Sequence, residues 1–224
     1  MAFGKAFHLA MEYYDLFQNT YDIAPEFKGV RGNTKAQQLE KWTNETGKLP
    51  LSNDEMIRIN LMRKRICENE DFENLFKDSM NEITIFAKDP TTNLLLKGKV
   101  DLLKYDHEFD GFVIGDYKTC QPLFLSNEKK IQSDILYGPS RMFYQYSFYR
   151  FLFQCLGFNS EFHFLFIEKE LPFGFRIVHL DMDFYSHGLE KIFTELYDFS
   201  ECQKLDYWPD YETNLTITFP QYLK

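Results

Sequence analysis

Hydrophobic residues recur at helical spacing in several parts of the chain. This pattern predicts a first helix from Lys5 to about Asp15 and a short helix from Thr34 to Thr43. The segment "LSNDEMIRINLMRKRICEN" predicts a third helix, in which Ser52 and Glu55 are spaced as a capping box. Its apolar residues fall near helical spacing and predict one buried face, made of Met56, Ile59, Leu61, Met62 and Ile66.

Two further helices are expected in the second half of the chain. The aromatic segment "PSRMFYQYSFYRFLFQCLG" predicts one, with Pro139 near its start and Gly157 as its stop. The segment "DFYSHGLEKIFTELYDFSECQKL" predicts the last one, with Asp183 as its N-cap. Between the strands and these helices we expect a mobile loop from Gln121 to Gly138, and the tail after the last helix should be short and irregular.

A period of two residues predicts strands in the middle of the chain. The runs "NEITIFAKD", "NLLLKGKVDLLKYD" and "GFVIGDYKTC" are separated by "DPTTN" and "DHEFDG", which are rich in turn residues. Connections this short predict antiparallel neighbours. The runs "SEFHFLFIEKE" and "GFRIVHLDMD" predict two more strands. The order of elements indicates one α/β or α+β domain over residues 1–224, with a mixed sheet flanked by helices.

Two acids interrupt the apolar pattern of the second and third strands. If residues 106 to 111 form the loop between them, Leu103 pairs with Ile114 and Asp101 comes directly opposite Asp116. Like charges that face each other destabilise a sheet, so this register predicts a positive charge between the two carboxylates.

A shorter, two-residue turn at Asp110–Gly111 is the alternative register. It would place Leu103 opposite Lys118 and Tyr105 opposite Asp116, so apolar residues would face charged ones. Apolar matching therefore favours the longer loop. In either register Lys118 shares a face of its strand with Asp116, because strand side chains alternate with a period of two.

Two interpretations of these charges are open on the pattern alone. The acids could be strand ends that face water, with Lys118 as a simple ion-pair partner. Alternatively they could bind a divalent cation such as Mg²⁺, which favours carboxylate and carbonyl oxygen. The lysine would then orient or activate a water, or stabilise charge on a phosphate, during metal-assisted hydrolysis. Because such a site is completed by waters and substrate phosphates, it suits phosphodiester chemistry.

Composition narrows the class of protein only a little. The net charge of −9 argues against a broad basic surface for nucleic acid, although it leaves room for a locally basic groove. The sequence holds no run of about 18 apolar residues and no signal-peptide pattern, so we expect no membrane span and a cytoplasmic location in a bacterium or a phage-infected cell. Spacing does not support a zinc ribbon or an iron–sulfur cluster, and we expect reduced thiols at Cys67, Cys120, Cys155 and Cys202.

Five ordered motifs bear a resemblance to a known group of enzymes. "KVD" followed by "GDYK" across a hairpin resembles the PD-(D/E)XK nuclease superfamily. "FGKAFHLAMEYY" places a glycine four residues before His8, which resembles the G-x-x-x-H motif of the RecE (exonuclease VIII) and phage YqaJ-type exonuclease families. "YQYSFYRFLF" resembles their Q-x-x-x-Y helix. The segments "RGNTKAQQLEKWTNETGKLPLSNDEMIRI" and "FLFIEKELPFGFRIVHLD", with the tail "WPDY…ITFPQYL", are also similar, so the resemblance covers nearly the whole chain.

The resemblance implies a metal-dependent exonuclease on a PD-(D/E)XK core. Such an enzyme would use Mg²⁺, or Mn²⁺, with two ions per site, to degrade one strand of linear double-stranded DNA in the 5′-to-3′ direction. The metal ligands would be His8, Asp101, Asp116 and the carbonyl of Tyr117, and Lys118 would be the catalytic lysine. The single-stranded tails would pass to a single-strand annealing protein in recombination, and the enzyme would form a ring-shaped homo-oligomer.

Several other residues receive roles from the same resemblance. Glu82 matches an acidic position that could bind a second metal ion, directly or through water. Gln145 and Tyr149 lie one helical turn apart, where they could contact DNA or brace the catalytic strand. Each also has an ordinary structural alternative, such as a solvated strand end for Glu82 or a core position for Tyr149. The candidate phosphate contacts are Arg31, Lys35, Lys129 and Lys130.

Two other functions remain possible on the sequence. An endonuclease or a DNA-repair nuclease could share the same fold and chemistry. A catalytically idle DNA-binding module is the other alternative, although the intact set of Asp101, Asp116 and Lys118 argues against it. The histidine motif begins almost at the first residue, whereas relatives usually have a further helical segment before it.

Overall fold

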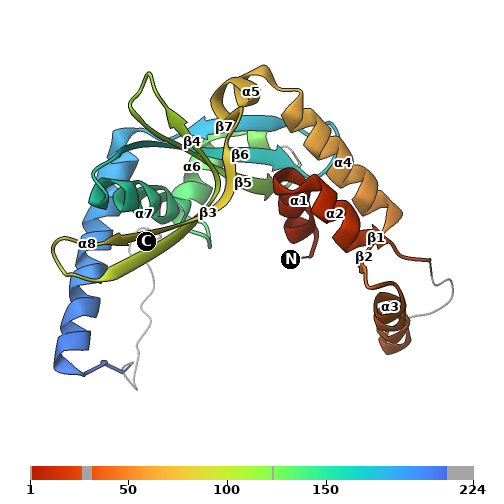
Figure 1. Cartoon of the computed structure of the whole chain (residues 1–224), viewed down its shortest axis with the longest axis horizontal. Coiled ribbons are helices and arrows are strands. Elements are labelled where there is room, and N and C mark those ends of the chain that lie inside the picture. Colours follow the sequence, from red (N-terminus) through yellow and green to blue (C-terminus); the bar gives the residue numbers. More distant parts are fainter. Residues whose placement is uncertain (1, 27–31, 123, 211–224) are drawn as a thin grey trace, which may run out of the picture.

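The computed structural model describes residues 2–26, 32–122 and 124–210 (Figure 1). Its first part is mostly helical, with a short parallel pair of strands between the helices. The helices are α1 (Ala2–Glu12), α2 (Tyr14–Thr20), α3 (Asn33–Thr46), α4 (Asn53–Cys67) and α5 (Glu70–Phe76), and the strands are β1 (Tyr21–Ile23) and β2 (Leu49–Leu51).

A five-stranded mixed sheet follows, in the order β3-β4-β5-β6-β7. Its strands are β3 (Met80–Lys88), β4 (Leu95–Asp106), β5 (Gly111–Cys120), β6 (Asn159–Glu168) and β7 (Phe175–His179). Only β5 and β6 run parallel, and the chain passes between them through a 3₁₀ turn (Phe124–Ser126), α6 (Glu128–Tyr137) and α7 (Met142–Cys155). The last helix is α8 (Met182–Leu205). This arrangement confirms the predicted mixed sheet with an antiparallel hairpin meander and flanking helices.

Two hydrophobic cores cover the two faces of the sheet. On one face α6, α7 and α8 pack on the sheet through many aromatic residues, with Phe143, Tyr146, Phe151, Phe162 and Phe164 among the most buried. On the other face α1, α2, α4 and α5 pack through Phe7, Phe17, Ile59, Met62, Ile66 and Phe76. In Figure 1 α4 and α8 accordingly lie at opposite sides of the molecule.

The hairpin register confirms the longer of the two predicted loops. Leu103 pairs with Ile114 and Tyr105 with Phe112, and the pairing extends to Asp106 with Gly111. The capping box at the start of α4 is also confirmed, since the Ser52 side chain accepts from the Glu55 N–H and the Glu55 carboxylate accepts from the Ser52 N–H. The shorter turn is therefore excluded, and Asp101 and Asp116 come to the same end of the paired region.

The prediction of a mobile loop from Gln121 to Gly138 is wrong. That segment contains the 3₁₀ turn and α6, which begins after Asn127, whose side chain accepts from the Lys130 N–H. Ile131 and Ile135 lie one helical turn apart and are buried in the core. The cap residue and this apolar spacing were the signals for a helix, and the polar residues around them masked the pattern.

Smaller corrections concern element boundaries. The N-cap of α8 is Asp181, which accepts from the N–H groups of Asp183 and Phe184, and Asp183 itself lies in the first turn. The first helix begins at Ala2 rather than Lys5 and ends at Glu12, after which α2 continues the chain beyond Tyr13. Most of the predicted irregular tail, residues 211–224, lies outside the described part of the chain.

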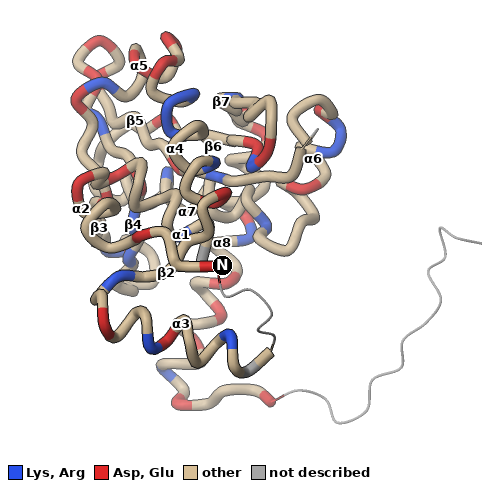
Figure 2. Tube along the Cα trace, turned by 90° about the vertical axis from the view of Figure 1, so that its right-hand side faces the viewer, with Lys and Arg blue, Asp and Glu red and all other residues tan. Residues whose placement is uncertain are grey.

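The charged residues and the cysteines are arranged as the composition leads us to expect. Figure 2 shows basic and acidic residues interspersed along the trace. All four cysteines are free thiols. Among the residues that the structure describes, no helix is both long enough and apolar enough to cross a membrane.

Candidate metal centre and catalytic hairpin

The acids that interrupt β4 and β5 lie where these two strands separate. Counted outward from the hairpin turn, the backbone pairing between β4 and β5 ends at Leu102 and Gly115. The next residues outward are Asp101 and Asp116. The Asp101 carboxylate accepts a hydrogen bond from the backbone N–H of Tyr117 at 2.8 Å. The side chain of Asp101 thus satisfies a backbone donor of β5 at the fork and holds the two strands at a defined separation.

Helix α1 brings two more ligand-type side chains to Asp101. His8 Nδ1 lies 3.4 Å from Asp101 Oδ2 and 3.5 Å from Glu12 Oε1. One ligand atom from each of these three residues lies within 4.8 Å of the other two. The structure therefore places a cluster of one imidazole and two carboxylates between α1 and β4.

Glu12 is a site residue that the sequence reasoning missed. It lies four residues after His8 on the same helix, so both side chains project from one face. The spacing H-x-x-x-E in "HLAME" was the available signal. Its side chain is only 5% exposed, which is unusual for a glutamate without a full set of partners.

The packing of α1 explains why His8 and Glu12 point at the sheet. Ala6, Phe7 and Ala10 are completely buried against the α4 side of the core. The Phe7 ring also meets the edge of the Tyr117 ring, with centroids 6.1 Å apart. The apolar face of α1 fixes its rotation, and His8 and Glu12 lie at the border of that face, next to the fork.

The electrostatics of the cluster are unfavourable without a cation. Burial, followed by the nearby charge of Asp116, raises the pKa of Asp101 to about 7. Burial lowers the pKa of His8, but the carboxylates of Glu12 and Asp101 outweigh it, so the net direction is upward. Asp101 therefore holds a proton more tightly than an ordinary aspartate, and the nearby carboxylates favour the protonated form of His8, so a divalent cation would compete with protons at this cluster.

The acceptor atoms of Glu12 give an independent test of whether a cation fits. Within the described residues, the buried oxygen Glu12 Oε1 accepts no hydrogen bond of good geometry, and its ion-pair partner is His8 Nδ1 at 3.5 Å. Buried carboxylate oxygens rarely lack donors, because desolvation of a charged group is costly. The donor set of two carboxylates and one imidazole suits Mg²⁺ or Mn²⁺, and the residues therefore fit a divalent cation.

Asp116 is held by two side chains on the α7 face of the sheet. Its Oδ2 contacts the Lys118 ammonium, which also lies over the Phe164 ring at 5.8 Å. Its Oδ1 accepts a hydrogen bond from the Gln145 side-chain amide of α7. Asp116 is thus adjacent to the cluster of His8, Glu12 and Asp101 without belonging to it.

The two residues predicted on α7 both brace β4 and β5. Gln145 contacts β5 through Asp116, and the Tyr149 hydroxyl donates to the Lys99 carbonyl of β4 at 2.8 Å. These contacts correspond to the bracing alternative of the sequence analysis. DNA contact by the same side chains remains a prediction.

Glu82 occupies an irregular position on β3. The pairing of β3 with β4 skips it, and the register on either side places it across from Asp101. Its backbone has a φ of 57°, a conformation that is costly for a residue with a side chain and that often marks functional positions. Its carboxylate pairs with the Lys99 ammonium, so its role with a second metal ion stays a prediction, as does that of the Tyr117 carbonyl.

The basic residues predicted to contact phosphate lie away from this cluster. Lys35 is on α3, where it lines a separate cavity with β2 and the start of α4. Lys129 and Lys130 are exposed on α6. Arg31 lies outside the described residues. The fold does not gather these four residues into the site, and their contacts with DNA remain untested.

This fold belongs to the PD-(D/E)XK class. Comparisons with known proteins agree with this assignment. The chain belongs to the family described as "PDDEXK-like domain of unknown function (DUF3799)", whose model matches residues 1–216. No curated protein matches the chain.

One solved structure supports the same fold. A protein from Eubacterium rectale named "Putative exonuclease" aligns with a TM-score of 0.56 and 13% identity, covering 96% of this chain and 88% of that chain. The structure of SSO0001 aligns with a TM-score of 0.33 and 11% identity, covering 81% of this chain and 91% of that chain. The first likeness establishes the fold, and the second is too weak to support an argument.

Proposed function

We propose that this protein is a divalent-cation-dependent deoxyribonuclease that degrades one strand of linear double-stranded DNA from an end. The observation that carries the proposal is the convergence of His8, Glu12 and Asp101 beside the ion pair of Asp116 and Lys118. An arrangement of acids around a cation, with a lysine next to it, suits hydrolysis of a phosphodiester. The intact set also argues against an idle DNA-binding module.

The cation would be held by His8, Glu12 and Asp101, with Asp116 close enough to join when substrate arrives. When bound, Mg²⁺ or Mn²⁺ supplies charge stabilisation at the phosphate oxygens and lowers the pKa of a coordinated water. Glu82 could bind a second ion, directly or through water, as the resemblance to RecE-type enzymes implies. His8 must lose its proton to act as a ligand, so binding of the cation should release protons.

Lys118 provides the mobile positive charge of the site. Its side chain is 26% exposed and its ammonium contacts Asp116, so the ammonium would be placed between solvent and a phosphate at the fork. There it would orient the attacking water or stabilise negative charge that develops on the phosphate. Gln145 keeps the Asp116 carboxylate in place, because its amide holds the oxygen that Lys118 does not contact.

The finer parts of the proposal are supported by the motifs of the sequence. The G-x-x-x-H and Q-x-x-x-Y elements resemble those of RecE and YqaJ-type exonucleases, and on this basis we propose attack at ends, 5′-to-3′ polarity and transfer of tails to a single-strand annealing protein. A ring-shaped homo-oligomer around DNA belongs to the same proposal. The name of the Eubacterium rectale protein is consistent with the exonuclease part of this proposal.

Digestion of two forms of the same plasmid tests this function. End-labelled linear duplex and covalently closed circular DNA are each incubated with Mg²⁺, with Mn²⁺ or with EDTA. We expect progressive loss of one strand of the linear form with either metal, no attack on the circle, and no reaction in EDTA. Attack on the closed circle would contradict the exonuclease assignment and indicate an endonuclease.

Two variants assign the reaction to this site. Lys118→Ala and Asp116→Ala should each lower the rate by at least about a hundredfold, since each removes a charge at the reacting phosphate. Lys204→Ala, an exposed lysine near the end of α8, is the matched control and should retain full activity. Full activity in Asp116→Ala or Lys118→Ala would show that the chemistry occurs elsewhere.

A further inference from the structure

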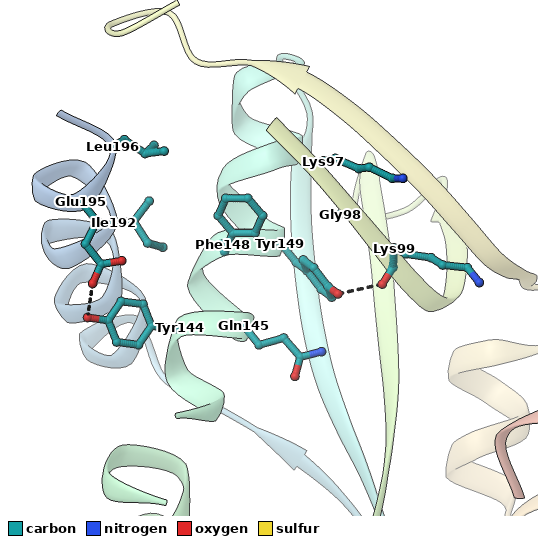
Figure 3. Close-up of a pocket in the computed structure, with 10 residues that line it drawn as sticks. All are labelled: Lys97, Gly98, Lys99, Tyr144, Gln145, Phe148, Tyr149, Ile192, Glu195 and Leu196. Carbon is teal, nitrogen blue, oxygen red and sulfur yellow. Dashed lines mark hydrogen bonds between the residues drawn. The ribbon is translucent and has the colours of Figure 1, made fainter. Parts of the chain in front are cut away.

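A cavity of about 620 Å³ opens directly beside the candidate site, between α7, α8 and β4 (Figure 3). Its walls are mostly apolar and aromatic. The apolar part of the lining consists of Tyr144, Phe148 and Tyr149 from α7, Ile192 and Leu196 from α8, and Gly98 of β4. The polar part consists of Lys97, Lys99, Gln145 and Glu195. Ligand cavities of this size and character commonly hold flat organic groups.

Tight contact at Gly98 sets the shape of this cavity. A Cβ at position 98 would lie 2.5 Å from Leu152 Cδ1 and 3.0 Å from Tyr149 Cε1, so a larger residue there would force these two side chains of α7 to shift. Tyr144, Phe148 and Tyr149 remain half-buried because the space in front of them is not filled by α8. Three aromatic rings therefore line a space that the described part of the chain leaves open.

The cavity and the candidate site share two residues. Gln145 lines the cavity and donates its amide to Asp116, and Tyr149 lines it and donates its hydroxyl to the backbone of β4 two residues before Asp101. Figure 3 shows Gln145 and Tyr149 projecting from α7 toward β4, with Phe148 on the side of α8. A group in the cavity would therefore lie next to a phosphate bound at the fork.

The charged groups of the rim suit a nucleotide. Lys97 and Lys99 flank Gly98, and their side chains leave β4 on the side of β3 (Figure 3). There Lys97 lies over the Phe86 ring, and the Lys99 ammonium contacts the Glu82 carboxylate. These two ammonium groups offer positive charge to a phosphodiester backbone along β4. On the opposite wall the Tyr144 hydroxyl donates to Glu195 at 2.8 Å, so hydrogen-bonding groups are available to the edge of a base.

We infer that this cavity takes an unpaired nucleobase of the DNA strand that is cut. The inference rests on the proposed nuclease function and names the part of the substrate that the enzyme grips beside the reacting phosphate. Stacking on aromatic side chains is a common way to hold single-stranded bases, and it tolerates any base because every base has an aromatic face. The nucleotide next to the cleaved bond is thus separated from its partner strand before cleavage.

Removal of a single base from the substrate tests this inference. Linear duplexes carrying one abasic nucleotide at successive positions near the 5′ end are compared with intact duplex in single-turnover cleavage. We expect one position adjacent to the cleaved bond at which loss of the base lowers the rate about tenfold, the value of one base–aromatic stack. In Phe148→Ala the same abasic substitution should have little further effect, because base and ring act together.

A cavity-filling variant keeps the test independent of fold damage. Leu196→Trp adds bulk from α8 while leaving the α7 aromatics intact, and it should abolish the abasic effect as Phe148→Ala does. Tyr137→Ala changes an aromatic residue that is 82% exposed on α6 and serves as the matched control, with an unchanged abasic effect. An equal abasic effect in wild type, Phe148→Ala and Leu196→Trp would overturn the inference.

Binding in EDTA separates failure of the inference from failure of the proposed function. A single-stranded oligonucleotide with one 2-aminopurine should show base-stacking quenching with wild type and at least about tenfold weaker binding with Phe148→Ala and Leu196→Trp. Cleavage of linear DNA without these effects would refute only the base-binding cavity. Quenching without nuclease activity in the presence of any metal ion would refute the proposed function. The inference as stated would then fail too, because it rests on that function. If free deoxynucleoside monophosphate bound as tightly as the oligonucleotide, the cavity would hold the mononucleotide product rather than a base of the substrate strand. That result would also overturn the inference.

Discussion

At the scale of single residues, buried titratable groups fall into two kinds with opposite meaning. Asp101 and Glu12 are carboxylates buried close to each other and to His8, an arrangement that is costly unless a cation joins them. His163 on β6 is also buried, at 3% exposure, but it lies against the rings of Phe76 and His179, and the Glu161 carboxylate is 3.7 Å from its Nε2. The first kind is a candidate ligand site, and in the second kind burial disfavours the charged form.

His163 should make the fold sensitive to acid. Burial, followed by the nearby charges of His179 and Arg150, lowers its pKa from 6.5 to about 4. Neither ring nitrogen has a hydrogen-bond partner within the described residues. As the pH falls from about 6.5 to about 4, the unfolded chain gains a proton that the folded protein does not, so stability is lost in this window.

Replacing His163 should reduce this loss of stability at low pH. Wild type should lose about 2 kcal/mol more than His163→Phe between pH 7 and pH 4, measured by urea unfolding at each pH. His107→Phe, in the exposed loop of the hairpin, is the control and should follow wild type. Parallel pH profiles for wild type and His163→Phe would show that His163 is not buried in its neutral form.

At the scale of elements, the site depends on how closely α7 lies against β4. Gly98 permits the contact, and Tyr149 and Gln145 then reach the backbone of β4 and the carboxylate of Asp116. The helix thereby fixes both catalytic strands from one side, while α1 supplies His8 and Glu12 from the other. A displacement of either helix should disturb the site without changing any of the acids.

Gly98→Ala should therefore lower both stability and activity. The added methyl group would lie 2.5 Å from Leu152 Cδ1, and Leu152 is completely buried, so we expect a loss of about 1–3 kcal/mol in unfolding free energy. Combining it with Leu152→Ala should restore part of the activity, because the clash is removed although a cavity is left.

Gly4→Ala is the matched control for this substitution. Gly4 is the glycine of the histidine motif in α1, and a Cβ there would meet no heavy atom within 4 Å, so chemical denaturation should show unchanged or slightly raised stability. Equal stability of Gly98→Ala and wild type would show that the contact between α7 and β4 is not tight.

At the scale of the whole molecule, a bound cation would join the N-terminal helices to the sheet. His8 and Glu12 belong to α1, whereas Asp101 belongs to β4, in the middle of the catalytic hairpin meander. A ligand that binds only the folded protein stabilises it in proportion to the logarithm of its concentration over the dissociation constant. Metal binding should therefore be visible in the global unfolding temperature, independently of nuclease activity.

Mn²⁺ at about one hundred times its dissociation constant should add about 2.7 kcal/mol, which corresponds to a rise in melting temperature of about 5 °C or more. At the same concentration Glu12→Gln should show about half of this gain, since loss of a carboxylate ligand weakens binding at least about tenfold. Differential scanning calorimetry with and without Mn²⁺ measures both values.

The comparison within each variant removes any effect of the substitution on the metal-free protein. Glu45→Gln, at an exposed ion pair on α3, is the control and should show the full gain. A full gain in Glu12→Gln would show that Glu12 is not a ligand and return the ligand set to the residues named from the motifs, which are His8, Asp101, Asp116 and the carbonyl of Tyr117.

Local pattern was enough to predict much of the fold and the centre of the site. Alternation of apolar residues and turn residues determined the hairpin, and apolar matching selected its register, which brought Asp101 and Asp116 to one end of it. The capping box at Ser52 and the helical spacing behind it determined α4 in the same way. These features depend on neighbours a few residues apart along the chain, or directly across one turn.

Tertiary structure alone decided the remaining partners. Nothing in the sequence near Glu12 indicates that α1 packs beside β4, since that contact depends on burial of Phe7 and Ala10 against a helix some fifty residues later. The same is true of Gln145 on Asp116 and of the aromatic cavity between α7 and α8. The sequence by itself determined which residues could carry the chemistry, whereas long-range packing decided which of them meet, because helix rotation and strand separation are set by the whole core.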